Sequence, residues 1–315
     1  MPKPVTRQED LTNLKSRLEA GEVRAIARAI SLVEAGDPQG SELLAQLRPR
    51  TGQARLIGIT GTPGSGKSTL TDALVGEARA RGERVAVIAV DPSSPFTGGA
   101  ILGDRIRMTR WHSDEGVFIR SMASRGHLGG MAAATLQVAA LLDAAGFPLI
   151  IIETVGVGQS EVEIAHVADT TVLVLTPGQG DTVQTFKAGV MEIADLFVVN
   201  KADQPGAQRL KRELRAMLDI SLDHGDPWRT PILETIANQG EGVGQLMDVL
   251  QEHHAHLEST GLLPELKRRR ARYEVASILR EELQRTLARS QEELIDDILA
   301  GRLTPETAAR SLLER

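Results

Sequence analysis

A chain of 315 residues, 41% of them hydrophobic and 25% charged, has the composition of an ordinary globular protein and can bury a large core. Its formal net charge of −6 argues against a surface that coats DNA or a membrane, because phosphate-rich partners require an excess of positive charge. The chain has no cysteine, which excludes disulfides, iron–sulfur clusters, thiolate zinc sites and thiol catalysis.

The N-terminus and the apolar runs of the chain carry no pattern for export or membrane insertion. The N-terminal segment lacks the apolar stretch of a secretory signal. The longest apolar run, from Pro148 to Ile152, is cut by Glu153 and is far too short to span a bilayer. We therefore expect a cytoplasmic protein with neither nucleic acid nor membrane among its partners.

Residues 1–50 are predicted to form a helical N-terminal extension. Apolar residues recur at helical spacing along two segments, and Asp37 followed by Pro38 is the pattern that opens a further short helix. The expected buried faces consist of Leu11, Leu14 and Leu18 in the first segment and Val23, Ile26, Ala27 and Ile30 in the second.

Residues 51–260 alternate apolar strands with amphipathic helices. Such a pattern indicates an α/β fold in which helices cover both faces of a mostly parallel sheet, and the motifs below make it a P-loop G domain. The predicted strands are Leu56–Thr60, Arg84–Val90, Val117–Arg120, Leu149–Glu153, Thr171–Thr176, Leu196–Asn200 and Ile232–Thr235.

Residues 261–315 are predicted to form a helical C-terminal extension. Its apolar stripe fits either an intrachain packing face or a dimerisation arm, and it consists of Leu266, Tyr273, Ala276, Leu279, Leu283 and Leu287. The basic run from Lys267 to Arg272 is expected to be a solvated face. We expect the same of the cluster His253, His254 and His256, because a metal site also needs converging ligands.

A phosphate-binding motif follows the first predicted strand. The pattern G-x-x-x-x-G-K-[S/T] is met by Gly61, Thr62, Pro63, Gly64, Ser65, Gly66, Lys67 and Ser68, and an amphipathic helix comes next. Glycines let successive backbone N–H groups point at phosphate oxygens, and the helix N-terminus adds partial positive charge. Lys67 is expected to reach the β- and γ-phosphates, and the Ser68 hydroxyl to bind Mg²⁺.

A base-reading motif, Asn200-Lys201-Ala202-Asp203, stands at the end of a later strand. The Asp203 carboxylate can accept hydrogen bonds from both N1–H and the N2 amino group of guanine, which adenine does not offer. Charged hydrogen bonds of roughly 1.5–3 kcal/mol each imply a preference for guanine of at least ~100-fold. Asn200 is expected to brace the loop while Lys201 lies along the purine. An isolated tetrapeptide of this kind is as often a helix-capping turn, but a P-loop and a buried strand precede it here.

Three carboxylates suit a metal site beside the P-loop. Asp91 and Glu153 end predicted strands, and Asp104 lies in the loop after Asp91. Mg²⁺ binds oxygen ligands in octahedral geometry and uses few protein side chains. Each residue alone fits an ordinary turn, but together they indicate metal ligands, and Glu153 and Asp104 join Lys67 as the predicted catalytic residues. Gly156 is expected to sense the γ-phosphate through its N–H.

Taken together, these segments resemble the MeaB/ArgK/MMAA-type GTPases. The resemblance covers the G domain and both helical extensions, and it rests on Gly61–Thr69 and on residues 91–94, 98–105, 125–130, 153–161 and 200–203. It implies a homodimeric GTPase that binds GTP, GDP and Mg²⁺ and docks on a B₁₂-dependent acyl-CoA mutase, above all methylmalonyl-CoA mutase. There it would gate cofactor loading and protect or reactivate the enzyme.

The resemblance also implies roles for individual residues. It places Lys67 and Ser68 on phosphate and Mg²⁺, Asp91, Asp104 and Glu153 around the metal, Asp203 on guanine, and Thr235, Ile236 and Ala237 in a second base loop. The loop Pro177–Asp181, with Gln184 and Lys187, is similar to the family's third switch. No glutamine directly follows Gly156, so we predict slow intrinsic hydrolysis that the mutase accelerates.

Other classes of function compete with this interpretation. A nickel-type metallochaperone GTPase would have a similar G domain, but it should carry cysteine and histidine ligands nearby. A small-molecule kinase or transport ATPase would share the P-loop, and Asp203 argues against it. A non-enzymatic scaffold would not need Lys67 and Ser68.

Overall fold

The computed structural model describes residues 7–92, 108–124, 133–154, 160–178, 191–221 and 228–313. The chain divides into two compact units, Met1–Lys267 and Arg268–Arg315, and each is described by itself. The three-part division expected from the sequence, with boundaries at residues 50 and 260, stays a prediction.

A seven-stranded sheet forms the centre of the first unit, in the order β3-β2-β4-β1-β5-β6-β7. Every pairing between these strands is parallel. The strands are β1 (Arg55–Gly61), β2 (Val85–Pro92), β3 (Val117–Ser124), β4 (Leu149–Thr154), β5 (Thr170–Leu175), β6 (Leu196–Asn200) and β7 (Ile232–Thr235). All seven strands predicted from the sequence are present, and the α/β class is confirmed.

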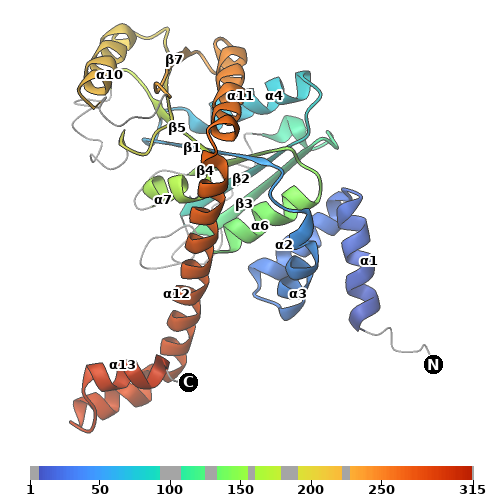
Figure 1. Ribbon diagram of the computed structural model, residues 1–315, viewed down its shortest axis with the longest axis vertical. Coiled ribbons are helices and arrows are strands. Elements are labelled where there is room, and N and C mark those ends of the chain that lie inside the picture. The colour runs from blue at the N-terminus through green and yellow to red at the C-terminus, as the bar shows by residue number, and fades with distance from the viewer. Residues whose placement is uncertain are drawn as a thin grey trace. The chain divides into compact units, whose positions relative to one another are not determined.

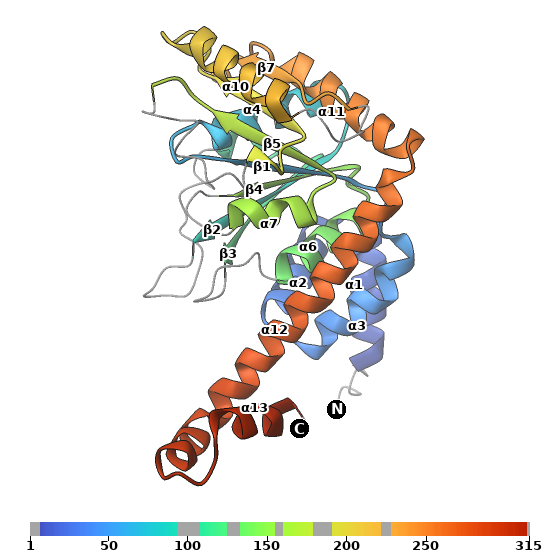
Figure 2. The same ribbon diagram turned by 60° about the vertical axis from the view of Figure 1, so that its left-hand side comes forward.

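Helices cover both faces of this sheet, as the near-continuous apolar strands predict. Side chains of a strand alternate between faces, so Val172 and Val174 of β5 pack with helices α4 and α11, whereas Leu173 and Leu175 pack with α10. Figure 2 shows α6 and α7 on the side of the sheet away from α4 and α11. The helices are α4 (Lys67–Ala80), α6 (Ala133–Ala144), α7 (Ser160–Val167), α10 (Ala207–Ser221) and α11 (Val243–Ser259).

Three N-terminal helices precede the sheet, and α2 and α3 pack against α6 (Figure 1). They are α1 (Arg7–Glu19), α2 (Val23–Glu34) and α3 (Pro38–Leu47). A short 3₁₀ turn, η1 (Arg48–Arg50), follows α3, and another, η2 (Thr109–Trp111), lies between β2 and β3. The predicted face of α1 is buried at Leu11, Leu14 and Leu18. The Asp37 side chain accepts a 2.8 Å hydrogen bond from the Gln39 N–H, which confirms the predicted start of α3.

The buried face of α2 differs by part of a turn from the predicted one. Val23 is 47% exposed, although it was expected inside. The buried residues are Ala25, Ile26, Ala29, Ile30 and Val33. Ala25 and Ala29 are small enough to lie where α2 approaches its neighbours closely. The prediction from the sequence placed the larger Val23 in the buried face instead.

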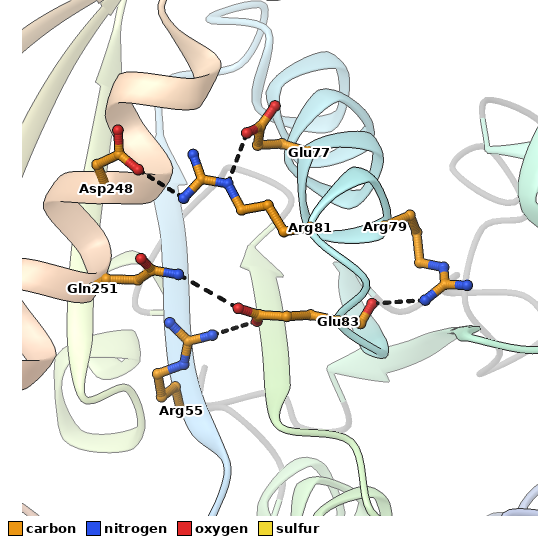
Figure 3. Close-up of polar contacts among 7 residues, drawn as sticks. All are labelled: Arg55, Glu77, Arg79, Arg81, Glu83, Asp248 and Gln251. Atoms are coloured by element: carbon orange, nitrogen blue, oxygen red, sulfur yellow. Dashed lines mark hydrogen bonds and ion pairs between the residues drawn. The ribbon is translucent and has the colours of Figure 1, made fainter.

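A polar network ties α4 to α11 (Figure 3). Arg81, just after α4, donates to Glu77 Oε1 at 2.8 Å and to Asp248 Oδ1 at 2.7 Å. Beside it Arg55 of β1 pairs with the Glu83 carboxylate. The helix that begins at the P-loop is therefore fixed at its far end to α11 and to β1.

The prediction that His253, His254 and His256 form a solvated surface cluster is wrong for His253, whose side chain is buried, at 2% exposure. Its Nδ1 lies 2.8 Å from Thr170 Oγ1, and its ring centroid is 4.6 Å from that of Trp228. His254 and His256 are partly buried. A histidine can join a core when a hydroxyl and an aromatic ring meet its polar and apolar parts, and neither partner is near it in sequence.

The second unit contains most of α12 (Leu262–Leu299), followed by α13 (Pro305–Leu313). The apolar stripe of α12 is largely exposed, at 58% for Leu279, 45% for Leu283 and 47% for Leu287. In the basic run, Lys267, Arg268, Arg269 and Arg272 are exposed, as expected. Among the described helices of both units, none combines the length and apolarity needed to cross a membrane.

Candidate nucleotide-binding site

The phosphate-binding motif forms the loop between β1 and α4, at the carboxyl edge of the sheet. Gly66 caps α4 in the left-handed conformation, with φ of 89°. The Lys67 amine turns back over the loop and donates to the carbonyl oxygens of Gly61 at 2.7 Å and Thr62 at 3.0 Å. The chain thus folds as strand, loop and helix, which is the context in which this motif cradles phosphate.

Two glycines of the loop are required by close approach. A Cβ atom on Gly61 would lie 2.2 Å from the Val174 carbonyl oxygen, and one on Gly66 would lie 2.4 Å from Asn200 Nδ2. Both glycines also have positive φ, at 143° and 89°. Any side chain at either position would therefore push the loop away from β5 or from Asn200.

A hydroxyl and a carboxylate meet at the start of α4. The Ser68 hydroxyl donates to Glu153 Oε1 at 2.6 Å, across 85 residues of sequence, and both side chains are buried. Glu153 stands near the end of β4, the neighbour of β1 in the sheet. Because β1 and β4 end at the same edge and α4 follows the loop after β1, the Ser68 hydroxyl and the Glu153 carboxylate come together.

The base-reading motif contacts the P-loop directly. Asn200 Nδ2 donates to the Ser65 carbonyl at 2.9 Å, and Lys201 Nζ donates to the Gly64 carbonyl at 3.0 Å. Lys201 has a positive φ, of 55°. In the described part of the chain it is the only residue other than glycine with a positive φ. Left-handed backbone in a lysine costs free energy and is retained where function demands it. Asp203 follows at the exposed surface of the same turn.

The Thr235–Ala237 segment joins the same cluster. Asn200 Oδ1 accepts from Thr235 Oγ1 at 3.1 Å and from the Ala237 N–H at 3.2 Å. Ile236 pairs with Glu241 in an isolated antiparallel bridge, so its side chain identity matters less to the loop than its backbone. One amide therefore connects the P-loop, the base-reading motif and this third segment.

Several predicted site residues lie outside what the structure describes. Asp104 and Gly156 are in segments without a described placement, as are Gln184 and Lys187 of the loop that resembles a third switch. Asp91 is at the end of β2, and its backbone alone is described. Thr69 and Pro63 are exposed on the P-loop side of α4.

The described residues suit a magnesium ion. Ser68 and Glu153 supply hard oxygen ligands beside the phosphate loop, at 2.6 Å from each other. No group of three or more histidine, cysteine or acidic side chains gathers within the described residues. Mg²⁺ commonly takes few protein ligands and completes its shell with water and nucleotide phosphate, so a two-residue contribution fits it.

A pair of buried threonine hydroxyls under the site was not predicted from the sequence. Thr60 and Thr154, both fully buried, lie 3.1 Å apart between their hydroxyl oxygens, at the ends of β1 and β4. They join the strand that enters the P-loop to the strand that carries Glu153. Threonine is common in strands, so only the register of the two strands reveals the pair.

Comparison with known proteins identifies the family. The sequence model described as methylmalonyl-CoA mutase-associated GTPase MeaB matches residues 26–292. The chain belongs to the MeaB family of GTPases. The protein is therefore a guanine-nucleotide-binding GTPase, as its P-loop and its Asn-Lys-x-Asp motif predict.

Relatives of this MeaB-family chain span nearly its whole length. A Pyrococcus abyssi protein to which GTPase activity is ascribed is 48% identical over 311 residues, which cover 96% of both chains. The Mus musculus protein named methylmalonic aciduria type A homolog, mitochondrial, is 32% identical over 98% of this chain and 80% of its own. A crystal structure of a LAO/AO transport system kinase superposes with a TM-score of 0.73 at 29% identity, covering 100% of this chain and 98% of that one.

Proposed function

We propose that this protein is a Mg²⁺-dependent GTPase that acts as a chaperone of a B₁₂-dependent acyl-CoA mutase. The observation that carries the nucleotide part is the pair of hydrogen bonds from Asn200 and Lys201 to the P-loop carbonyls of Ser65 and Gly64. They hold a guanine-reading turn and a phosphate cradle within one site, as a single guanosine triphosphate requires.

Each part of the nucleotide meets a different group of residues in this proposal. The phosphates lie along Gly61–Thr69 with Lys67 on the β- and γ-phosphates, and Asp203 and the Thr235–Ala237 segment surround the guanine. Ser68 and Glu153 hold the metal together with Asp91 and Asp104, and Gly156 senses the γ-phosphate. The ion, when bound, neutralises charge that develops on the phosphate oxygens.

Hydrolysis by the isolated protein is slow in this proposal. The residue after Gly156 is Val157, where water-orienting GTPases carry a glutamine. Lys67 stabilises negative charge on the phosphates, but it offers no acceptor that could orient the attacking water. A partner that orders the neighbouring segments would therefore raise the rate.

A mutase is the partner that the family relationship supports. The matching family is described as mutase-associated, and the mouse relative is named for methylmalonic aciduria. We expect methylmalonyl-CoA mutase loaded with adenosylcobalamin to raise GTP turnover by at least ~10-fold, because partner-assisted GTPases gain that and more. Phosphate release measured with and without purified mutase tests this.

Two comparisons make the mutase experiment decisive. The Lys67→Ala chain mixed with mutase should show no stimulated turnover, which assigns the measured activity to this protein. Fast turnover by the isolated wild-type chain would contradict the proposal. If only another B₁₂-dependent acyl-CoA mutase stimulated turnover, that mutase would be the partner and the proposed mechanism would stay the same.

The exposed apolar face of α12 supports a homodimer. Leu279, Leu283 and Leu287 recur every four residues and are each 45–58% exposed in the single chain. Contiguous exposed leucines of this kind mark protein interfaces. We expect Leu279→Glu with Leu283→Glu to convert a dimer into a monomer in analytical ultracentrifugation.

A matched variant shows whether loss of the dimer comes from the disrupted apolar face or from added negative charge alone. Gln284→Glu adds negative charge to an exposed position of the same helix and should leave the dimer intact. A wild-type chain that sediments as a monomer at micromolar concentration would contradict the dimer.

A kinase is the second candidate, because the superposed crystal structure is that of a LAO/AO transport system kinase. A kinase would transfer the γ-phosphate to a small molecule, and it would not need a carboxylate aimed at guanine. The Asp203 experiment in the Discussion distinguishes the two, since a kinase that uses ATP would bind ADP as well as GDP.

A further inference from the structure

A cavity of about 770 Å³ lies at the edge of the sheet opposite to the P-loop. The turn between α1 and α2 and the first two residues of α2, together residues 20–24, form one wall. The other wall is formed by Arg84 and Gly116, which directly precede β2 and β3, and by Arg79 of α4. Because the strands are parallel and the P-loop follows the end of β1, the cavity is separate from the nucleotide site.

Arg84 brings a positive charge to this cavity without a carboxylate beside it. Its Nη1 donates to the carbonyls of Ala145 at 3.1 Å and Gly146 at 3.3 Å, and its Cζ lies 4.2 Å from the Phe147 ring centroid. Within the described residues it forms no ion pair. Burial, and then the charge of Arg79, lower the pKa of Arg84 from its ordinary value, as expected for a cation that lacks a counter-ion.

The other side of this guanidinium lies beside Gly21, and both residues line the cavity. A Cβ atom placed on Gly21, in the α1–α2 turn, would lie 2.9 Å from Arg84 Nη2. Gly21 has φ of 78° and lines the cavity. Nη1 donates to two carbonyls that directly follow α6, whereas Nη2 lies close to Gly21 and donates no hydrogen bond within the described residues.

Two further arginines line the same space. Arg79 leans away from Arg81, as Figure 3 shows, and donates to Asp114 Oδ2 at 2.9 Å and to the Glu83 carbonyl at 2.9 Å. Arg24 is exposed and makes no ion pair with any described residue. Arg79 is thus largely neutralised, while Arg24 adds a positive charge that also helps to lower the pKa of Glu22.

The acidic residues of the cavity do not cancel this charge. Arg17 donates its Nε to Glu22 Oε2 at 2.7 Å, and this hydrogen bond is the main cause of the lowered pKa of Glu22. Glu22 is therefore committed to a residue outside the cavity wall. Glu115 is exposed and is the remaining carboxylate of the lining. The lining thus contains three arginines, Arg24, Arg79 and Arg84, and two carboxylates, Glu22 and Glu115.

The N-terminus of α2 adds further positive electrostatic potential to the cavity. Val23 and Arg24 are the first residues of this 12-residue helix and line the cavity. Glu22, at the cap position, makes no capping hydrogen bond with its side chain, and the first turn contains no acidic residue. The N–H groups of a helix start carry partial positive charge and suit an anion.

We propose that this cavity binds the phosphate group of a small molecule, held by Arg24, Arg84 and the start of α2. Guanidinium groups bind phosphate oxygens in a forked geometry that combines charge with directed hydrogen bonds. A volume of about 770 Å³ is within the range of small-molecule sites, which favours a compact phosphate ester over a peptide. The site is independent of the nucleotide and of any mutase.

Equilibrium dialysis with radiolabelled inorganic phosphate tests the proposal on the full chain. The protein is first saturated with Mg²⁺ and a non-hydrolysable GTP analogue, so that the P-loop and its γ-phosphate position are filled. We expect saturable binding of one phosphate per chain. Arg24→Glu should weaken it by about 10-fold or more, because a charged hydrogen bond is lost and a repulsive charge takes its place.

Control variants separate a phosphate site from general charge and from misfolding. Arg215→Glu makes the same charge change at an exposed position of α10 and should bind phosphate like the wild type. Arg84→Gln should also lose binding, but Arg84 is partly structural, so the exposed Arg24 carries the decision. Absence of saturable binding, or equal binding by Arg24→Glu and Arg215→Glu, would overturn the proposal. So would displacement of phosphate by an acidic hexapeptide that binds more tightly.

Discussion

Replacing Asp203 with asparagine is expected to move the nucleotide preference from guanine to xanthine. The carboxylate accepts two hydrogen bonds from guanine, at N1–H and at the N2 amino group, and each charged bond contributes roughly 1.5–3 kcal/mol. Asparagine offers one acceptor and one donor, which match the N1–H and the C2 carbonyl of xanthine. We expect GDP affinity to fall ~100-fold or more and the affinity for xanthosine diphosphate to rise.

Titration calorimetry with GDP, xanthosine diphosphate and ADP measures this exchange directly. Asp219→Asn removes a carboxylate from an exposed position of the neighbouring α10 and should leave GDP affinity unchanged. Equal affinity of the wild type for ADP and GDP would remove the guanine assignment and favour the kinase. If the Lys67→Ala chain lost GDP binding and the Asp203→Asn chain retained it, the phosphate-binding role of Lys67 would be supported and the base-recognition role of Asp203 would not.

The second large effect is expected from Glu153→Gln. Glutamine has nearly the same shape, and its amide oxygen can still accept from the Ser68 hydroxyl, whose present bond to Glu153 is 2.6 Å long. The negative charge that would hold Mg²⁺ is lost. We expect GTP hydrolysis to fall by roughly 100-fold and the Mg²⁺ concentration for half-maximal activity to rise.

Nucleotide affinity in the presence of a chelator distinguishes a metal role from a structural one. GDP binding without Mg²⁺ should be nearly equal in wild type and Glu153→Gln, because the P-loop and Asp203 are unchanged. Glu252→Gln, at an exposed position of α11, provides the matched charge control. Wild-type hydrolysis and Mg²⁺ dependence in Glu153→Gln would exclude this residue from the metal site.

Local sequence rules predict the two ends of the nucleotide site because each predicted end is a short continuous motif. Residues 61–68 and Asn200–Asp203 each follow an apolar strand, and their conformations depend on glycine and on strand ends. The parallel sheet was predictable for the same reason, since apolar runs of strand length alternate with amphipathic helices. Leu11, Leu14 and Leu18 of α1 were likewise correctly assigned to the core from their spacing.

Contacts between distant segments followed only from the tertiary structure. The Asn200 side chain joins Ser65, 135 residues away, to the Thr235–Ala237 loop, and no periodicity in the sequence indicates that partner. His253 was assigned to the surface because its neighbours along α11 are polar, yet Thr170 and Trp228 enclose it. Burial of a polar side chain depends on which partners the fold supplies, and these come from other elements.

By itself, the sequence determined the fold class and predicted the phosphate loop and the guanine-reading motif, because each follows from patterns of residues adjacent along the chain. The tertiary structure alone decided which distant residues share a site. Parallel pairing of β1 with β4 brought Glu153 close to Ser68, and the packing of α2 against α1 and α6 placed Arg24 and Arg84 around one cavity. Such neighbours are set by how whole elements pack, and packing depends on the entire chain at once.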